Sequence, residues 1–125
     1  MTDIYDTGAL LALERLDRAA WARWKGALER SDRPRTHGGV VGQAWRGSPR
    51  QARLAVALRG MIVAPIDDVA GRRAGALLAA SDTADVIDAA LAHLAADGDL
   101  VHTSDPEDLA HLVAVLGRHV EVVRV

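Results

Sequence analysis

The chain has 125 residues, half of them hydrophobic, so it can form one domain whose core removes about two-thirds of the unfolded surface from water. It contains no cysteine, which excludes disulfide bonds, zinc–thiolate sites and thiol nucleophiles, and its net charge of −2 is unlike that of proteins that coat nucleic acid. Neither a signal peptide nor an apolar run near the roughly 18 residues of a membrane span is evident, so we expect one cytoplasmic domain over residues 1–125 with no membrane association.

The first half of the chain begins with a short strand and continues with helices. The spacing of its apolar residues predicts, in order, a strand at 2–6, one or two helices over 10–28, a short extended segment at 35–38, and helices over 40–46 and 49–59. The long helical stretch is predicted from leucine and tryptophan side chains three or four residues apart. Ser48 followed by Pro49 is typical of an N-cap and a first helical residue, and Gly60 is the expected end of that helix.

The second half alternates between strands and helices. In order, it predicts a buried strand at 61–66, a helix over 70–78, a helix that Ser81-Asp82-Thr83 caps and Asp97-Gly98 ends, a strand at 100–103, a helix over 105–116 and a strand at 119–125. Strands that alternate with helices imply right-handed crossovers and a mostly parallel sheet with helices on both faces. We therefore expect the α/β fold class.

The segment around Asp6 is the centre of the predicted site. Asp6 lies where the first apolar strand gives way, through Gly8, to a helical pattern, and a charged residue at such a junction has few structural uses. Ligands of parallel sheets bind beyond the carboxyl ends of the strands. Because Asp105 follows the strand at 100–103, we expect its carboxylate and that of Asp6 at the same edge of the sheet.

A third acidic position lies at the start of a helix, where Asp85 and Asp88 are three residues apart and share a helix face. Several carboxylates in one cleft repel one another, and a divalent cation removes that conflict. Hard oxygen ligands without nearby histidine or cysteine favour one or two Mg²⁺ or Mn²⁺ ions, which activate water for phosphodiester hydrolysis. In such a site, the hydroxyls of Thr7 and Ser104 would orient carboxylates or bound water.

Each later acid also has a purely structural interpretation. Asp105 before a proline is typical of an N-cap, and Asp85 or Asp88 would stabilise a helix N-terminus through the helix dipole. For Asp67, which follows the predicted strand at 61–66, capping is the favoured interpretation. Metal binding and helix capping are therefore alternatives for Asp85, Asp88 and Asp105.

Arginine supplies every basic residue except Lys25, and its planar group suits phosphate. Arg46, Arg50 and Arg53 are spaced four and three residues apart, which on one continuous helix forms a row that can face phosphate groups. Ordinary solvent-exposed arginines are the more common explanation of such a spacing.

The three tryptophans and His37 are further candidates for binding residues. At helical spacing, Trp21 and Trp24 have the character of core or interface residues, and we interpret Trp45 in the same way rather than as a platform for RNA bases. His37, beside two glycines, is interpreted as a loop residue.

Four blocks of the sequence, in order, resemble a known family. They are Asp6-Thr7-Gly8-Ala9-Leu10, Val40-Val41-Gly42-Gln43-Ala44-Trp45-Arg46, Asp85-Val86-Ile87-Asp88-Ala89-Ala90-Leu91-Ala92 and Val101-His102-Thr103-Ser104-Asp105-Pro106-Glu107-Asp108-Leu109. Over nearly the whole chain, they resemble PIN-domain proteins of the VapC toxin type. The tripeptide Asp-Thr-Gly also occurs in aspartic proteases, but those proteins are all-β and here it leads into a helix.

The resemblance implies a three-layer α/β/α fold and an Mg²⁺- or Mn²⁺-dependent endoribonuclease that hydrolyses RNA phosphodiester bonds. It also implies a toxin that forms a homodimer, acts on RNA such as tRNA and is inhibited by a cognate antitoxin protein. By position, Asp6 and Asp105 match the first and last acids of the family, and Asp88, with Asp85 one turn earlier, matches its helix acid.

Gln43 departs from the family pattern, which has glutamate at this position. An amide oxygen binds a metal or water without supplying charge, so we expect weaker metal binding. Two function classes follow. One is a working ribonuclease in which Asp6, Gln43, Asp88 and Asp105 act together, and the other is a PIN-like domain that binds RNA or a protein partner but cuts poorly.

Overall fold

A five-stranded parallel sheet forms the centre of the molecule in the computed structural model, which describes residues 1–30 and 32–125. Its strands, in sheet order, are β3 (Ile62–Ala64), β2 (Arg35–His37), β1 (Asp3–Tyr5), β4 (Leu100–Thr103) and β5 (Glu121–Arg124). Every neighbouring pair is parallel. The expected α/β class with a parallel central sheet is confirmed.

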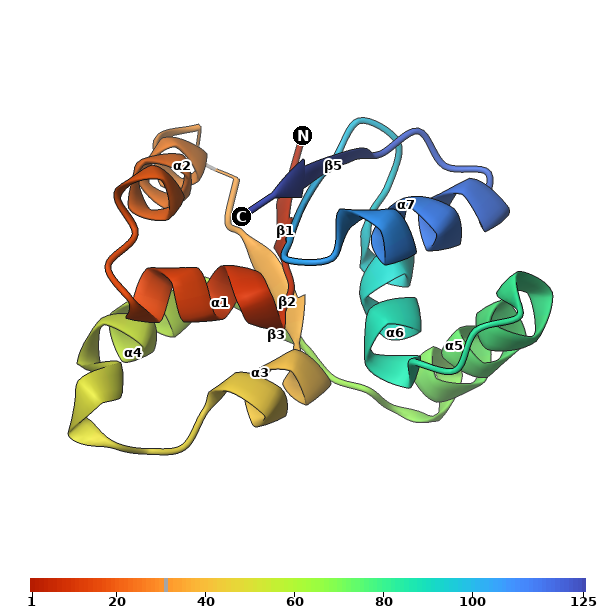
Figure 1. The fold of residues 1–125 in the computed structure, drawn as a ribbon, viewed down its shortest axis with the longest axis horizontal. Coiled ribbons are helices and arrows are strands. Elements are labelled where there is room, and N and C mark those ends of the chain that lie inside the picture. Colours follow the sequence, from red (N-terminus) through yellow and green to blue (C-terminus); the bar gives the residue numbers. More distant parts are fainter. Residues whose placement is uncertain (31) are drawn as a thin grey trace.

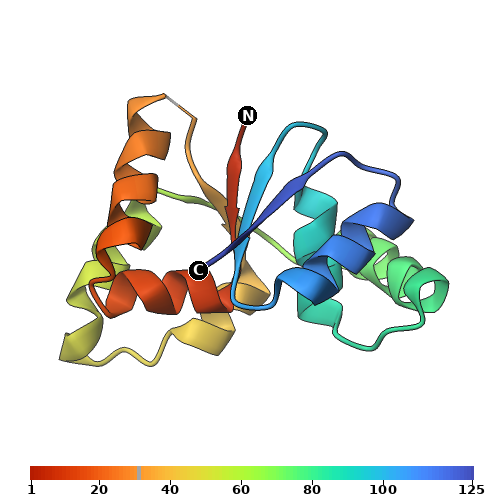
Figure 2. The ribbon, with the colours of Figure 1, turned by 45° about the horizontal axis from the view of Figure 1, so that its top comes forward.

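Helices cover both faces of the sheet and give a three-layer α/β/α arrangement (Figure 1). One layer contains α1 (Thr7–Glu14), α2 (Arg18–Glu29) and α4 (Ala52–Arg59), and the other contains α5 (Asp68–Ser81), α6 (Val86–Leu94) and α7 (Pro106–Val115). Figure 2 separates the two layers on either side of the strands. The short helix α3 (Gly38–Ala44) continues from β2 and packs against α1.

The core lies between these layers and fixes β1 beside β4. Ile4 and Val101 pair in register on the two strands, and neither side chain is exposed. Leu10 from α1 is fully buried in one helix layer, and Leu91 and Leu109 are fully buried in the other. Burial of one such side chain contributes roughly 2 kcal/mol to the free energy of unfolding.

Among the described residues, no helix combines the length and apolar character that crossing a membrane requires.

The segment that follows α3 differs from the prediction. Ser48 makes no side-chain hydrogen bond to the next turn, and a 3₁₀ turn (Pro49–Gln51) precedes α4. Ser48 therefore occupies the predicted N-cap position before Pro49, but its side chain does not cap the turn, and the turn is 3₁₀ rather than the first turn of α4. Gln51 supplies the local hydrogen bonds instead, because its amide holds the preceding loop at the backbone of Ala44, Arg46 and Gly47.

Two further expectations are corrected in the second half of the chain. The strand predicted as buried, β3, is an edge strand with one neighbour, and the side chain of Val63 is 43% exposed. The cap predicted at Ser81-Asp82-Thr83 is also wrong, because Ser81 ends α5 and Asp82 takes a left-handed conformation with φ of 55°. That conformation stops the helix, and Asp85 caps α6 instead.

The order of the strands positions the predicted site. β1 has β2 on one side and β4 on the other, so the chain order reverses at β1. In parallel sheets, ligands bind at such a reversal, beyond the carboxyl ends of the strands. Asp6 follows β1, and Asp105 follows β4 as the residue before α7. The topology therefore puts both acids at the same edge of the sheet, as expected.

Candidate functional site

Asp6 is the most buried acid at this edge. The register of β1 and β4 pairs Tyr5 with His102, and the backbone N–H of Asp6 donates to the carbonyl of His102 at 3.1 Å. The pairing continues into the next position, so Asp6 and Thr103 lie side by side. The side chain of Asp6 points away from solvent, and the residue is only 6% exposed.

Hydrogen bonds hold the Asp6 carboxylate in one orientation. Its Oδ1 accepts from the backbone N–H of Ala9 at 2.8 Å, which makes Asp6 the N-cap of α1. Its Oδ2 accepts from the hydroxyl of Thr103 and from the backbone N–H of Ser104 at 3.3 Å. Burial raises the pKa of Asp6 above its usual range, and these hydrogen bonds offset only part of that rise.

The two acids of α6 have different roles. Asp85 is the N-cap, because its Oδ1 accepts from the backbone N–H groups of Ile87 at 3.0 Å and Asp88 at 3.1 Å. Asp88 makes no cap. Burial and then the negative charges of Asp85 and Asp6 raise the pKa of Asp88 to about 7, with smaller effects from Asp105 and Asp108. Of the two, Asp88 is therefore the better candidate ligand.

Asp105 occupies the N-cap position of α7 but accepts no capping hydrogen bond there. Its backbone N–H donates to the hydroxyl of Thr103 at 2.8 Å, and its side chain is exposed. The neighbouring Asp108 lies one turn along α7, where a hydrogen bond with the Asp105 carboxyl group raises the pKa of Asp108. The structural interpretation of Asp105 as a capping residue is thus not supported by a hydrogen bond.

Thr103 is a site residue that the sequence prediction missed. Its hydroxyl donates to Asp6 and accepts from the backbone of Asp105, so it connects the two acids. The orienting role was predicted for Thr7 and Ser104, but Thr7 donates to Gln43 and Ser104 contacts Asp6 through its backbone. Thr103 could have been identified only from its position beside Asp6. That position follows from the register of β1 and β4, which the sequence does not reveal.

Gly8 allows the beginning of α1 to approach the end of β4. A Cβ atom added at Gly8 would lie 2.2 Å from the Oγ of Ser104 and 2.5 Å from its Cβ. Real Cβ atoms do not approach other atoms so closely, so any side chain at this position pushes the two elements apart. The spacing between Asp6 and its partners at the end of β4 depends on this glycine.

His37 is a structural residue of the same edge and not the loop residue expected. It ends β2, is 1% exposed, and its Nδ1 accepts from the backbone N–H groups of Gly39 and Val40. This places the proton on Nε2, which donates to the carbonyl of Ile87 at 2.8 Å. Burial lowers the pKa of His37. The neutral ring therefore anchors the start of α6, and with it Asp88, to the end of β2.

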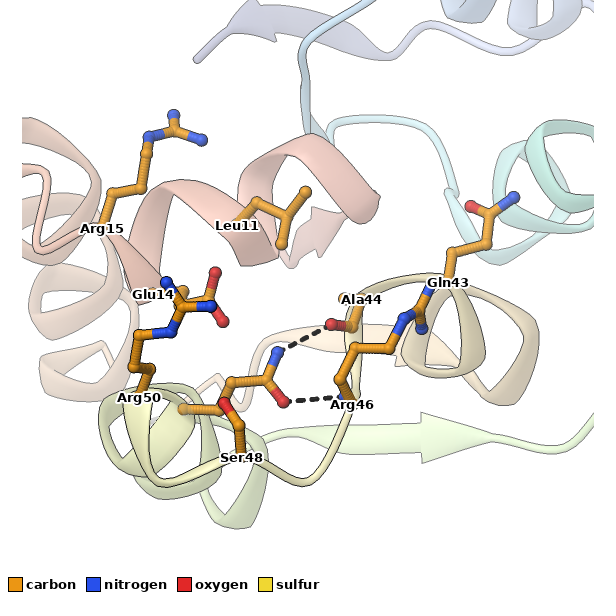
Figure 3. A pocket seen from close by; sticks show the side chains of 9 residues that line it. Leu11, Glu14, Arg15, Gln43, Ala44, Arg46, Ser48 and Arg50 are labelled. Atoms are coloured by element: carbon orange, nitrogen blue, oxygen red, sulfur yellow. Dashed lines mark hydrogen bonds between the residues drawn. The ribbon is translucent and has the colours of Figure 1, made fainter.

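Gln43 joins the sheet edge that carries Asp6, Asp88 and Asp105, which we call the acidic edge, to a neighbouring cavity. Its Oε1 accepts from the hydroxyl of Thr7, the residue after Asp6. The cavity has a volume of about 640 Å³ and lies between α1 and the segment from α3 to the 3₁₀ turn (Figure 3). Its lining includes one acid and three arginines, namely Leu11, Glu14, Arg15, Gln43, Ala44, Arg46, Ser48, Arg50 and Gln51. We refer to it as the arginine cavity.

The predicted row of three arginines is only partly present. Arg46 and Arg50 both line the arginine cavity, together with Arg15, which the sequence prediction did not include. Arg53 lies elsewhere, in a second cavity with Arg18, Trp21 and Lys25. The row fails because the segment is not one continuous helix but a loop, a 3₁₀ turn and α4.

The tryptophans follow the expectation in two cases. Trp24 is buried, and Trp21 packs against it edge to face with ring centroids 5.2 Å apart. Trp45 differs, because its side chain is 38% exposed in the loop after α3. Core packing thus explains Trp21 and Trp24 but not Trp45.

The donors at the acidic edge suit Mg²⁺ or Mn²⁺. Within residues 1–30 and 32–125, no three acidic or histidine side chains lie close enough together to hold a metal ion as they stand. Every acid proposed as a ligand nevertheless offers hard carboxylate oxygens, and the pKa of Asp88 is raised by burial and then by neighbouring negative charge. The chemistry of these residues fits a divalent cation. Closing a coordination shell requires rotation of the more accessible side chains, Asp88 and Asp105.

Comparison with known proteins adds no assignment at this point. No protein-family model matches the chain, and no curated protein matches it.

Proposed function

We propose that the protein is an Mg²⁺- or Mn²⁺-dependent endoribonuclease that hydrolyses RNA phosphodiester bonds. The main support is Asp88, whose pKa rises to about 7 because it is partly buried among the charges of Asp85, Asp6, Asp105 and Asp108. Such a concentration of like charge costs free energy in the folded protein, and strongly perturbed acids cluster at functional sites. A bound divalent cation relieves this repulsion.

Each residue of the edge has a role in this proposal. Asp6, Asp88 and Asp105 hold one or two ions, and the hydroxyl of Thr103 keeps Asp6 and the Asp105 backbone in place. When bound, the cation supplies activation of a water molecule and stabilises charge on the phosphate. Asp85 fixes the first turn of α6 and adds negative charge near Asp88. No side chain needs to act as the nucleophile.

The biological setting of the proposal rests on the resemblance of the four sequence blocks. We infer a toxin of a toxin–antitoxin pair that acts in the cytoplasm as a homodimer, with RNA as its substrate and a cognate antitoxin protein as its inhibitor. The three-layer parallel fold is compatible with that family, and fold alone does not assign an activity.

A second candidate function follows from Gln43. This residue carries no charge, and its Oε1 already accepts a hydrogen bond from Thr7. A site with one fewer carboxylate holds Mg²⁺ more weakly, which favours a domain that binds RNA or a protein partner and cuts slowly. The two candidates differ in cleavage rate and not in fold.

The test is the cleavage of a mixed pool of total RNA and tRNA by the purified protein with Mg²⁺, with Mn²⁺ or with EDTA. We expect discrete cuts that require the metal and disappear in the Asp6→Ala variant. Because Asp6 also caps α1, the Asp88→Asn variant serves as a second inactive control that leaves this cap intact. Failure of the folded, antitoxin-free protein to cut in either metal would contradict the nuclease proposal and favour the binding module.

A further inference from the structure

The arginine cavity lies beside the acidic edge without being part of it. Figure 3 shows Gln43 at one end of the cavity and Glu14 and Arg50 at the other. Gln43 is also bonded to Thr7, which follows Asp6, so one end of the cavity adjoins the predicted catalytic acids. A chain molecule bound at the acids can therefore extend into the cavity along α1.

Hydrogen bonds hold the wall of the cavity in place before any ligand binds. Gln51 is 4% exposed, and its amide accepts from the backbone N–H groups of Arg46 at 2.8 Å and Gly47 at 3.1 Å while it donates to the carbonyl of Ala44 at 2.8 Å. The guanidinium group of Arg46 donates to the carbonyls of Gly42 and Trp45. The loop that carries Arg46 is thus fixed by a buried side chain.

The charge of the cavity is opposite to that of the acidic edge. Three arginines and one glutamate line it, which leaves an excess of positive charge. In the described part of the chain, none of these arginines forms an ion pair with a carboxylate. Unpaired guanidinium groups in a partly apolar cavity are suited to bind phosphate, for which their donor geometry is well matched.

We propose that the arginine cavity binds a backbone phosphate of the RNA strand, away from the phosphate that is hydrolysed at the acids. This inference rests on the proposed ribonuclease function and adds a substrate subsite to it. Arg46 and Arg50 would turn their guanidinium groups toward the phosphate, and Arg15, whose guanidinium group points away from both in Figure 3, would reach it by rotation of its side chain. Leu11 and Ala44 form the apolar part of the wall. The acids and the arginines lie next to each other and differ in charge. The RNA strand would therefore bind in one register, with the scissile phosphate at the cation held by the acids and a second phosphate at the guanidinium groups.

An RNA strand fits this arrangement better than an acidic protein segment does. A peptide carboxylate in the cavity would leave the remainder of an acidic peptide beside Asp6 and Asp88, where like charges repel. An RNA backbone is also negative, but the metal ion that its cleavage requires neutralises the charge at that end. The arginine cavity therefore favours RNA, which binds together with the cation, over an acidic peptide.

The test measures binding separately from cleavage. Affinity of a fluorescein-labelled single-stranded RNA 12-mer is measured by fluorescence anisotropy over a range of salt concentrations, with the inactive Asp88→Asn protein in Mn²⁺. On this background, we expect Arg15→Ala and Arg50→Ala each to weaken binding by roughly three- to tenfold and to reduce the slope of log K against log salt by about 0.7, the value for one lost phosphate contact on a single strand.

Arg53→Ala is the matched control, because it removes the same side chain three residues from Arg50 but outside the arginine cavity. We expect it to leave the affinity and the salt slope unchanged. Equal effects of Arg50→Ala and Arg53→Ala, or no effect of either Arg15→Ala or Arg50→Ala, would overturn the proposal. The proposal would also be overturned, in favour of a protein partner, if an acidic 12-residue peptide displaced the labelled RNA as strongly as unlabelled RNA does.

Cleavage by the otherwise unchanged protein provides the second readout. Arg50→Ala should raise KM and leave kcat close to that of the parent, because the cavity binds a phosphate that does not react. If the parent protein cuts no RNA but the binding results are as expected, the ribonuclease proposal fails and the phosphate subsite stands. If the protein cuts RNA and the arginine variants behave like the control, the subsite fails alone.

Discussion

Asp3 begins strand β1 and Asp6 is the first residue after it. Both acids are buried, yet the pKa of Asp3 is lowered and the pKa of Asp6 is raised. Asp3 receives His102 Nε2 at 2.7 Å and the Arg30 guanidinium group at 2.6 Å. Burial alone would raise the pKa of Asp3, but the hydrogen bonds and charges of His102 and Arg30 lower it overall. Burial raises the pKa of Asp6, whose partners are a hydroxyl and backbone N–H groups.

The difference separates a structural acid from a candidate functional one. The carboxylate of Asp3 accepts hydrogen bonds from two side chains of the same chain, the Arg30 guanidinium group and His102. At the other end of the strand, Asp6 and Asp88 have carboxylates for neighbours and receive no such compensation among the interactions that shift their pKa values. The acids at this edge, of which Asp6 is buried and Asp88 partly buried, thus have no compensating cation from the chain among these interactions, and the proposed divalent cation would supply one.

The largest expected effect is on catalysis, from Asp88→Asn. If Asp88 is a metal ligand, as proposed, its loss should slow RNA cleavage by roughly 10³-fold, because several kcal/mol of charge stabilisation at the transition state are lost. Stability in EDTA at pH 8 should not fall, since the substitution removes a repelled charge. Initial rates and urea unfolding curves measure the two effects.

Asp85→Asn is the control for this prediction, because asparagine keeps the N-cap of α6. We expect it to slow cleavage by less than about tenfold, through weaker ion binding alone. A loss as large as that of Asp88→Asn would assign the ligand role to Asp85 instead.

The next effect is on stability, from Asp3→Ala. Removal of this buried side chain leaves His102 Nε2 and the Arg30 guanidinium group without their shared hydrogen-bond acceptor and should lower the free energy of unfolding by about 3 kcal/mol. Asp68→Ala, which breaks the exposed Arg72–Asp68 ion pair, should cost less than about 1 kcal/mol. Urea denaturation of both variants at pH 7 measures the difference, and equal costs would contradict the structural role of Asp3.

The two clusters should also differ in the pH at which they affect stability. The pKa of Asp88 is raised to about 7 in the folded protein, so without metal the free energy of unfolding should fall as pH rises from about 4 to 7 and then level off. Asp3 has a lowered pKa, so its contribution is present above its ordinary value near 4 and is lost as pH falls through the lower folded value.

Melting temperatures from pH 5 to 8 in EDTA isolate the first of these contributions. The decline should be smaller in Asp88→Asn than in the parent, and saturating Mg²⁺ should reduce it in the parent. An identical pH profile for the parent and the variant would show that Asp88 is not a repelled acid.

The smallest expected effect comes from Gln43→Glu. Glutamate retains an oxygen to accept the hydrogen bond from Thr7 and adds one negative charge next to the acids. We expect Mg²⁺ affinity to rise by roughly fivefold, equivalent to about 1 kcal/mol for a partly exposed charge. Isothermal titration with Mg²⁺ and initial cleavage rates measure the result. Higher Mg²⁺ affinity without any change in a measurable cleavage rate would exclude the weakened site as the limit on catalysis.

Much of the fold was predictable because it depends on local patterns. The short strand at the start, the strand at 100–103 and the helix after Pro106 were predicted from apolar runs and helix-start residues. One failure came where three local signals compete. Ser81, Asp82 and Asp85 are all good caps, and only the left-handed conformation of Asp82 decides between them.

The candidate site was predictable in its acids and not in its supporting contacts. Asp6 and Asp105 were placed at one sheet edge from topology alone, and Asp67 was correctly interpreted as a cap. Thr103 and Arg15 were missed because their roles depend on strand register and on the packing of α1 against a loop. Such contacts join residues far apart in sequence, and no local spacing encodes them.

The close contact between Gly8 and Ser104 has a consequence for how this chain tolerates change. A Cβ at position 8 would collide with Ser104, whereas the neighbouring position 7 already carries a threonine side chain. In a library with every substitution at every position, we expect position 8 to be as intolerant as the acids themselves, although it carries no reactive group. The missing side chain at position 8 thus determines how closely the start of α1 approaches the end of β4, and with it the distance between Asp6 and the residues after β4.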